Sequence, residues 1–272
     1  MQLAGPLVLV GAGNMGGALL KGWLDRGLAA SDVLVQDPVP PAPMVELMSA
    51  RGIAWSAALE AVDRTPSVIL LAVKPQIMDD VVPSVVGLCR PETVVLSVAA
   101  GRTIRSLAQH FPANTAIVRT IPNTPASVGR GITVAVANPA VTDSQRRLCQ
   151  ELLEAVGSVG WVDDERLIDA ATAVSGSGPA YVFLLAECLE GAALAAGLPA
   201  DLARRLARET VSGAGELLRQ SDRDAATLRE NVTSPKGTTA AALEVLMGPG
   251  AMPELMARAV KAAKDRAEEL AK

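Results

Sequence analysis

The chain has 272 residues, a formal net charge of −4, and a composition that is 50% hydrophobic but only 2% aromatic. This length suits two domains of ordinary size or one large one, and the core has to be built from Ala, Val and Leu. A nucleic-acid-binding protein is disfavoured, because such proteins usually carry a basic surface and aromatic side chains on which bases stack.

The start of the chain and its cysteines indicate neither a targeting signal nor a metal site. The opening MQLAGPLVLVGAG lacks a basic segment and a cleavage site, and no apolar run reaches the ~18 residues of a membrane span. Cys89, Cys149 and Cys188, with the single histidine His110, do not have the spacing of metal ligands. We therefore expect a cytoplasmic protein with idle thiols, no metal and no membrane partner.

Residues 1–162 alternate between short β-branched runs and stretches that are helix-like or rich in Gly and Pro. The runs expected to be strands are Pro6–Val10, Val33–Gln36, Val68–Val73, Thr93–Val98, Thr115–Arg119, Ile132–Val136 and Val159–Val162. Alternation of strands and helices is typical of a parallel, doubly wound sheet, and the continuous apolar run SVILLAV suits a strand covered on both faces. We predict an α/β domain over 1–162.

The pattern changes at residue 163. From there to 272 the β-branched runs vanish and Ala, Leu, Glu and Arg dominate, interrupted by Gly197-Leu198-Pro199 and by a polar stretch at 231–237. This predicts an all-α second domain over 163–272. Its apolar surplus could line either a contact between subunits or the core of the domain itself.

A glycine-rich loop follows the first predicted strand. LVLV runs into G-x-G-x-x-G, whose residues are Gly11, Ala12, Gly13, Asn14, Met15 and Gly16. The first Gly allows a tight turn, the second lets the backbone approach a pyrophosphate, and the third lets helix and strand pack closely. Because a helix N-terminus offers free N–H groups to phosphates, we predict that these residues bind a dinucleotide in a Rossmann-like domain.

Asp37 ends the second predicted strand, where a carboxylate can accept a hydrogen bond from a ribose hydroxyl. A 2′-phosphate would be repelled by this carboxylate, and no Arg or Lys follows it until Arg51. The predicted cofactor is therefore NADH or NADPH, with NADH favoured.

Two further loops follow predicted strands and would lie at the same edge of the sheet. One contains Ala72, Val73, Lys74 and Pro75, and the other contains Asn123 and Thr124. Ligands of open α/β sheets bind beyond the carboxyl ends of the strands, so these residues could contact a ribose or the carboxamide. Turn chemistry explains either loop alone, whereas both loops at one edge favour a cofactor site.

Five motifs together resemble the pyrroline-5-carboxylate reductase family, which forms L-proline. They are GAGNMG (11–16), AVKPQ (72–76), PNTP (122–125), SGSGPAY (175–181) and VTSPKGTT (232–239). The resemblance covers essentially the whole chain and implies NAD(P)H-dependent reduction of a small cyclic imino acid, L-1-pyrroline-5-carboxylate. It also implies a C-terminal domain that forms a homodimer, larger rings of dimers, and a substrate site between the domains of paired subunits.

The resemblance assigns the substrate to the polar stretch in front of an apolar helix. The carboxylate is implied to lie at Ser234, Lys236, Gly237, Thr238 and Thr239, with Thr239 near the imine nitrogen as the catalytic residue. A helix N-terminus with several free N–H groups suits an anion, and the same stretch would also serve as an ordinary cap. Many family members have Gly where this chain has Lys236.

The small-residue turn of Ser175, Gly176, Ser177 and Gly178 is expected either to admit the nicotinamide ring or to let helices pack tightly.

Two other functions are open from the sequence. A β-hydroxyacid dehydrogenase uses a Lys in the pattern G-S-G-x-x-x-K, but Val182 stands at that position here. A nucleotide-binding sensor would need no turnover. Reduction of a protonated imine needs no general base, which agrees with the position of His110 outside every motif.

Overall fold

The computed structural model describes residues 3–59 and 62–271. Parts of the expected domains 1–162 and 163–272, namely residues 1, 2, 60, 61 and 272, therefore lie outside the described residues. The chain forms two compact units, of which one runs to Gly176 and also includes the chain from Lys264 onward, and the other is Ser177–Ala263. The last strand ends at Trp161, close to the change of sequence pattern. The helical segments just before residue 177 and after residue 263 nevertheless belong to the same unit as the sheet.

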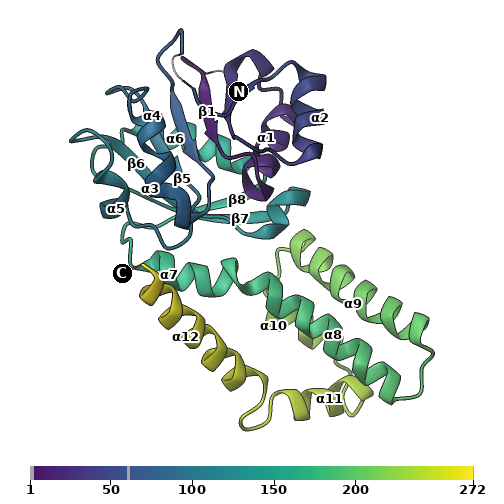
Figure 1. Cartoon of the computed structure of the whole chain (residues 1–272). Coiled ribbons are helices and arrows are strands. Elements are labelled where there is room, and N and C mark those ends of the chain that lie inside the picture. Colours follow the sequence, from purple (N-terminus) through teal and green to yellow (C-terminus); the bar gives the residue numbers. More distant parts are fainter. Residues whose placement is uncertain (1–2, 60–61, 272) are drawn as a thin grey trace. The chain divides into compact units, whose positions relative to one another are not determined.

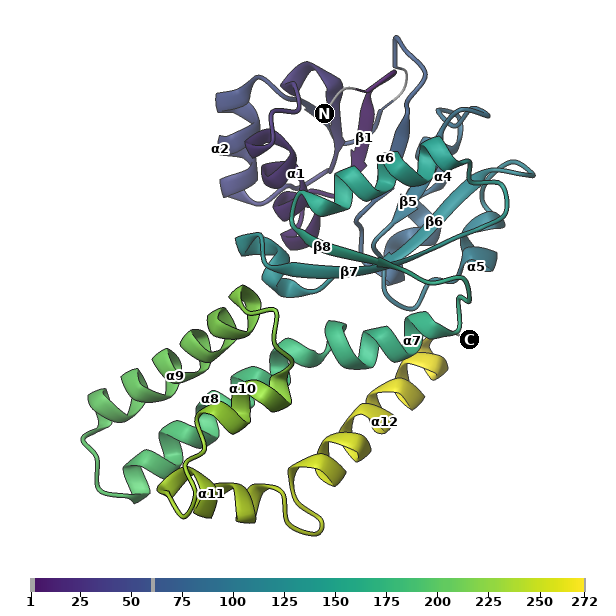
Figure 2. The same cartoon turned by 180° about the vertical axis from the view of Figure 1, so that it is seen from behind.

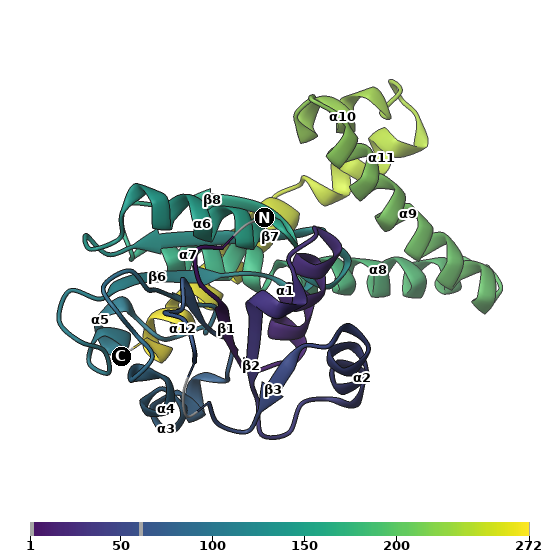
Figure 3. The same ribbon diagram turned by 90° about the horizontal axis from the view of Figure 1, so that it is seen from above.

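The first unit contains an eight-stranded sheet in the order β3-β2-β1-β4-β5-β6-β7-β8. Its strands are β1 (Leu7–Val10), β2 (Val33–Gln36), β3 (Ala54–Ser56), β4 (Val68–Leu71), β5 (Val94–Ser97), β6 (Ala116–Ile121), β7 (Gly131–Ala137) and β8 (Gly157–Trp161). Val10 pairs with Gln36 on one side and with Leu71 on the other, so β1, β2 and β4 end level with one another. Figure 3 shows β1, β2 and β3 side by side at one end of this sheet.

The sheet is parallel except where β6 pairs with β7. The chain passes from Ile121 to Gly131 through the short helix η3 (Thr124–Val128), and a parallel crossover needs a dozen or more residues. The predicted parallel, doubly wound sheet is therefore confirmed except at this one pair, which is antiparallel for that reason. β3 was not predicted either, because it is short and its side chains are exposed.

Both faces of the sheet are covered by helices that turn apolar side chains toward it. In β4 all side chains are buried, and Val68 and Leu70 join one cluster while Ile69 and Leu71 join the other, which confirms the prediction for SVILLAV. The helices of this unit are α1 (Asn14–Asp25), η1 (Ala30–Asp32), α2 (Ala42–Arg51), η2 (Pro75–Ile77), α3 (Met78–Val81), α4 (Pro83–Val86), α5 (Ile104–Ala108), α6 (Asp143–Glu154), α7 (Leu167–Ala171) and the π-helical turn η4 (Thr172–Gly176) (Figure 1). Side chains of α1, α2 and α6 fill the first cluster, and those of α3, α4 and α5 fill the second.

The second unit is helical, as predicted for the C-terminal part of the chain. It contains α8 (Gly178–Ala195), α9 (Ala200–Gln220), α10 (Ala225–Asn231), α11 (Thr238–Leu246) and much of α12 (Met252–Leu270). The helices α8 and α9 form a hairpin (Figure 2). Arg204 Nε lies 3.2 Å from Glu190 Oε1.

This second unit has almost no buried core of its own. Among its described residues only Ala203 and Ala207 are buried, whereas Phe183 is 68% exposed and Leu217 is 66% exposed. Large exposed apolar surfaces of this kind are typical of protein–protein interfaces.

One helical run, Leu167–Ala195, is long and apolar enough to cross a membrane by length and composition alone. The sequence prediction that no segment reaches spanning length is corrected on this point. A helix that packs against another protein surface passes the same test.

Candidate active site

The carboxyl ends of β1, β2 and β4 bring three predicted segments together. Gly11 N–H donates to the last carbonyl of β2, and Ala72 N–H donates to the last carbonyl of β1, each at 2.8 Å. Ala12 N–H donates to Asp37 Oδ2 at 2.7 Å. The glycine loop, Asp37 and the loop that begins at Ala72 therefore form one continuous edge, where dinucleotides bind in folds of this kind.

The three glycines of the loop differ in their surroundings. Gly11 has φ +93°, and a Cβ on it would lie 2.9 Å from the carbonyl oxygen of Ala72, so the turn requires glycine. A Cβ on Gly16 would lie 2.1 Å from the carbonyl oxygen of Gly11, so α1 and β1 could not approach as they do. A Cβ on Gly13 would meet no atom within 4 Å. The protein itself does not need glycine at Gly13, which favours a ligand against that position.

The N-terminus of α1 carries free donors beside this open space. Gly13 is the N-cap residue and gives no side-chain hydrogen bond, and the first turn contains no acidic residue. Asn14 and Met15 begin the helix, whose first N–H groups are available to an anion. This local geometry fits a pyrophosphate.

Asp37 has both carboxylate oxygens on backbone donors. Its Oδ2 accepts from Ala12, and its Oδ1 accepts from Val39 N–H at 2.9 Å. The preceding residue, Gln36, is buried and donates from Nε2 to Ser84 Oγ at 2.6 Å. The end of β2 is thereby fixed, and it holds a negative charge next to the glycine loop.

The loop after β4 lies beside a pocket of about 530 Å³ at this edge. Lys74 is exposed, and Ala72 and Val73 are half-buried, whereas Pro75 begins η2 and lines the pocket. Arg102 also lines this pocket.

An ion pair closes one side of this pocket. The Arg102 guanidinium hydrogen-bonds Asp79 and holds the pKa of that carboxyl below its usual value, and His110 Nε2 lies 2.9 Å from the same carboxylate. His110 is thus engaged with Asp79 outside every predicted motif.

Asn123 and Thr124 follow β6 at the same edge, but both polar atoms of the Asn123 amide already have a protein partner. The residue is 8% exposed, its Nδ2 donates to the carbonyl of Ser175 at 3.1 Å, and its Oδ1 accepts from Ile132 N–H at 2.9 Å. Thr124 begins η3 and is exposed. The predicted PNTP loop is therefore joined to the turn that precedes α8.

The small-residue turn spans the boundary between the two units. Ser175 and Gly176 end η4, Ser177 is the N-cap residue of α8, and Gly178 begins that helix. A Cβ on Gly176 would touch neighbouring atoms no closer than 3.5 Å, and one on Gly178 would meet nothing within 4 Å. Packing within the described protomer therefore does not require glycine at either position.

An ion cluster around a buried arginine on β6 was missed by the sequence analysis. Arg119 on β6 is 3% exposed, and its guanidinium contacts Glu165 Oε1 at 2.9 Å and Asp169 Oδ1 at 3.5 Å. The Glu165 carboxylate also accepts from Ile104 N–H at 2.7 Å. An Arg inside the apolar strand sequence AIVRTI was the available signal, because a buried charge needs a partner.

In the helical unit, the stretch that resembles the substrate loop precedes α11. Gly237 is the N-cap residue of α11 without a side-chain cap, and Thr238 and Thr239 form the first turn. Lys236 has φ +59°, a left-handed conformation that glycine adopts without strain. The helix α6, by contrast, has a complete capping box at Thr142, so α11 lacks a cap that this chain builds elsewhere.

Ser234 lies in the turn that leads into α11. Its carbonyl accepts from Gly237 N–H at 3.0 Å, and its side chain is exposed. Its Oγ lies 2.4 Å from the position that a Cβ on Gly237 would occupy, so the hydroxyl sits against this glycine.

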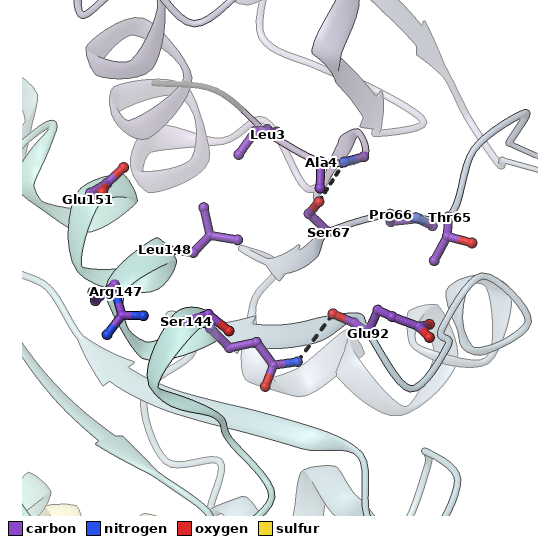
Figure 4. A pocket seen from close by; sticks show the side chains of 12 residues that line it. Leu3, Ala4, Thr65, Pro66, Ser67, Glu92, Ser144, Arg147, Leu148 and Glu151 are labelled. Carbon is purple, nitrogen blue, oxygen red and sulfur yellow. Dashed lines mark hydrogen bonds between the residues drawn. The ribbon is translucent and has the colours of Figure 1, made fainter.

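A larger hollow of about 700 Å³ lies at the opposite edge of the sheet (Figure 4). Ser67 lies directly before β4 and accepts from Gly5 N–H, and Gln145 Nε2 donates to the carbonyl of Glu92. None of the predicted site residues lines this hollow, which lies at the amino ends of the strands. Among the described residues no cluster of His, Cys, Asp and Glu could hold a metal ion.

Both parts of the chain match families of known proteins. Residues 6–101 match the family model described as NADP oxidoreductase, coenzyme F420-dependent, and residues 165–270 match the model for pyrroline-5-carboxylate reductase dimerisation. A pyrroline-5-carboxylate reductase from Pseudomonas aeruginosa is 36% identical over 97% of this chain and 96% of its own length. One from Synechocystis sp. is 38% identical over 98% of each chain.

Solved structures are similar over the same extent. A pyrroline-5-carboxylate reductase from Coxiella burnetii has a TM-score of 0.92 and 33% identity, covering 99% of this chain and 100% of that one. The Plasmodium falciparum enzyme with NADP bound has a TM-score of 0.82 and 27% identity, covering 99% of each.

The fold and its glycine loop define an oxidoreductase of the dinucleotide-binding class with a helical dimerisation domain. The exposed apolar surface of the second unit, including the long apolar helix α8, lies within the region matched by that dimerisation model. The chain belongs to the pyrroline-5-carboxylate reductase family.

Proposed function

We propose that this chain reduces L-1-pyrroline-5-carboxylate to L-proline with a reduced nicotinamide dinucleotide. Near-complete coverage by reductases of that name supports the reaction. The observation on this chain that carries the proposal is the open space over Gly13 at the uncapped start of α1, which a pyrophosphate fits.

In the first unit, the residues at the carboxyl edge of the sheet hold the dinucleotide. The backbone of Gly11 to Gly16 receives the pyrophosphate, and Asp37 receives a ribose hydroxyl. The loops at Ala72–Pro75 and Thr124 flank the nicotinamide half, and the Ser175–Gly178 turn keeps bulky side chains away from the ring. The bound cofactor supplies the hydride that forms the new C–H bond at the imine carbon.

In the second unit, the start of α11 binds the substrate carboxylate. Free N–H groups after Gly237, with the hydroxyls of Ser234 and Thr238, offer hydrogen bonds to an anion, and Lys236 adds a positive charge nearby. Thr239 is placed near the imine nitrogen, where its hydroxyl orients the protonated imine. Most of the rate enhancement then comes from positioning, because a protonated imine is already electrophilic.

The proposed mechanism needs no general base, and the surroundings of His110 agree with this. Its ring is hydrogen-bonded to Asp79, which is itself paired with Arg102. An alcohol dehydrogenase of similar plan would need a base such as Lys, whereas the corresponding position is Val182.

NADH is proposed as the preferred cofactor. The carboxylate of Asp37, which is hydrogen-bonded to the glycine loop, would lie beside a 2′-phosphate on the ribose and repel it. The Plasmodium falciparum relative was solved with NADP, so the preference has to be measured on this chain. The ratio of kcat/KM for NADH and NADPH measures it directly. Asp37→Asn keeps an acceptor for Ala12 N–H without the charge and should shift the ratio toward NADPH, and a wild-type preference for NADPH would reject the assignment.

The reaction is tested by following NADH absorbance with pyrroline-5-carboxylate and purified protein. Thr239→Ala should lower kcat/KM roughly 10- to 100-fold, because a hydrogen bond to a charged group contributes about 1.5–3 kcal/mol. Thr227→Ala is a matched control, since Thr227 is also half-buried in the first turn of a helix in the same unit. Cofactor binding without oxidation would favour the nucleotide-sensor alternative instead.

The dimerisation domain supports a homodimer as the working form. We further propose that dimers assemble into larger rings and that the enzyme acts in the cytoplasm. Sedimentation of the purified protein gives the ring size, and cell fractionation gives the compartment.

A further inference from the structure

Asn123 joins three segments of the first unit through its side chain. The segments are its own loop after β6, the start of β7 at Ile132, and the π-helical turn at Ser175. Both polar atoms of the amide are therefore engaged by backbone groups, and the residue is only 8% exposed. A buried amide with satisfied partners is more strongly constrained than a residue that waits for a ligand.

The same strand holds the helical segment at a second point. Arg119, near the carboxyl end of β6, contacts Glu165 before α7 and Asp169 within α7. With Arg119 and Asn123, one strand and its following loop therefore fix both the beginning and the end of the run from Glu165 to Ser175.

Within the run, Ser175 Oγ donates to the carbonyl of Ala171 at 2.9 Å, whereas Asn123 joins the end of the run to another element. The nearest atoms to a Cβ added on Gly176 belong to Thr172 and Ile121, at 3.5 and 3.7 Å, so this glycine is not tightly packed against its surroundings. A π-helical turn is also less regular than an α-helix and occurs often at functional sites. The polar tie from Asn123 thus sets the position of the Ser175 carbonyl.

We infer that Asn123 is a positioning residue for the cofactor: its amide fixes the backbone of Ser175 and Gly176 at the edge where the nicotinamide half binds. This rests on the proposed function, which places that turn at the ring. The sequence predicts direct contact between Asn123 and the cofactor. Asn123 acts indirectly instead, by holding the turn that lies next to the cofactor.

Asn123→Asp tests the inference with almost no change of shape. The carboxylate still accepts from Ile132 N–H, but it cannot donate to the Ser175 carbonyl and places an oxygen against it. We expect the Kd for NADH to rise about tenfold, which corresponds to the loss of one buried hydrogen bond.

Asn138 provides the matched control. It makes the same kind of bridge at the other end of β6, where Oδ1 accepts from Ile117 N–H at 3.1 Å and Nδ2 donates to the carbonyl of Thr115 at 2.8 Å. Asn138→Asp should lower the thermal midpoint by a similar amount as Asn123→Asp, yet leave the Kd for NADH within about twofold of wild type.

The pH dependence gives a second readout. A protonated Asp at position 123 regains a donor toward Ser175, so the binding defect of Asn123→Asp should shrink as the pH falls toward the pKa of the introduced carboxyl. Wild type and Asn138→Asp lack this carboxyl at position 123 and should not show that recovery.

Three results would overturn the inference. They are wild-type NADH affinity in Asn123→Asp, equal loss of affinity in Asn138→Asp, and a defect that is independent of pH. If Asn123→Asp does not fold, Asn123→Ala takes its place, because it removes the donor to the Ser175 carbonyl without introducing a charge, and unchanged NADH affinity in that variant is equally contrary. Failure of wild type to bind NADH would instead reject the proposed function.

Discussion

Gly13→Ala adds one methyl group at the position that most sharply separates fold from ligand binding. The added Cβ would meet no protein atom within 4 Å, and the residue has φ −68°, which alanine adopts readily. If a pyrophosphate packs against this backbone, the methyl group occupies the space of the ligand. The variant should therefore fold normally and bind the dinucleotide poorly.

The expected magnitudes separate these two effects. Ala is a poorer N-cap than Gly by roughly 0.5–1 kcal/mol, and the loss of flexibility in the unfolded chain offsets this by about 0.4–1 kcal/mol. The thermal midpoint should thus stay within about 3 °C of wild type. A methyl group forced into a filled space costs about 1–3 kcal/mol, so the Kd for NADH should rise roughly 5- to 150-fold.

The assay is titration with NADH followed by ligand fluorescence, with scanning calorimetry on the same samples. Gly160→Ala in β8 is the matched control, because an added Cβ there also meets nothing within 4 Å and the strand lies away from the glycine loop. Gly16→Ala should instead destabilise the protein, since its Cβ would overlap a carbonyl oxygen. Wild-type affinity in Gly13→Ala would refute the placement of the pyrophosphate.

Three further changes test other features of the chain. Lys236→Gly should raise the thermal midpoint by about 2 °C in calorimetry. A non-glycine residue in the left-handed conformation costs about 1–2 kcal/mol of folding free energy, and glycine at this position recovers part of that cost. A lower midpoint would contradict this. Burial raises the pKa of the Cys149 thiol to about 12, so iodoacetamide at pH 8 should label it only after denaturation, as peptide mass mapping would reveal. Arg102 lowers the pKa of Asp79 in the folded protein, so their interaction stabilises the fold. This stabilisation is fully present above the ordinary pKa of an Asp and is lost as the pH falls through the lowered pKa of Asp79. The difference in thermal midpoint between wild type and Arg102→Gln should therefore shrink in acid, and a constant difference would count against it.

Much of the fold follows from local sequence pattern. Val68–Leu71 is apolar at every position, and the structure buries it on both faces of the sheet. The glycine loop was placed correctly because a strand, three glycines and a helix occur together in sequence. The antiparallel pairing of β6 and β7 could not be read from strand patterns, since it depends on a short connection that cannot return the chain to the same end of the sheet.

The positions of the candidate site residues could be predicted where they belong to short sequence motifs. They could not be predicted where they depend on contacts between residues far apart in the sequence. Asp37 and the loop at Ala72 could be assigned to one edge because parallel strands end together. The hydrogen bond from Asn123 to Ser175 joins positions far apart in the sequence, and the sequence around either residue gives no sign of it. The cluster around Arg119 is similar, because only a buried charge hinted at partners on another element.

The nearly coreless helical unit has a consequence for how this enzyme loses activity. With only Ala203 and Ala207 buried among its described residues, the free energy that holds these helices must come largely from association with another subunit. Dilution should then act as a denaturant, and a harmful substitution in α8 would first show itself as a higher protein concentration needed for full activity.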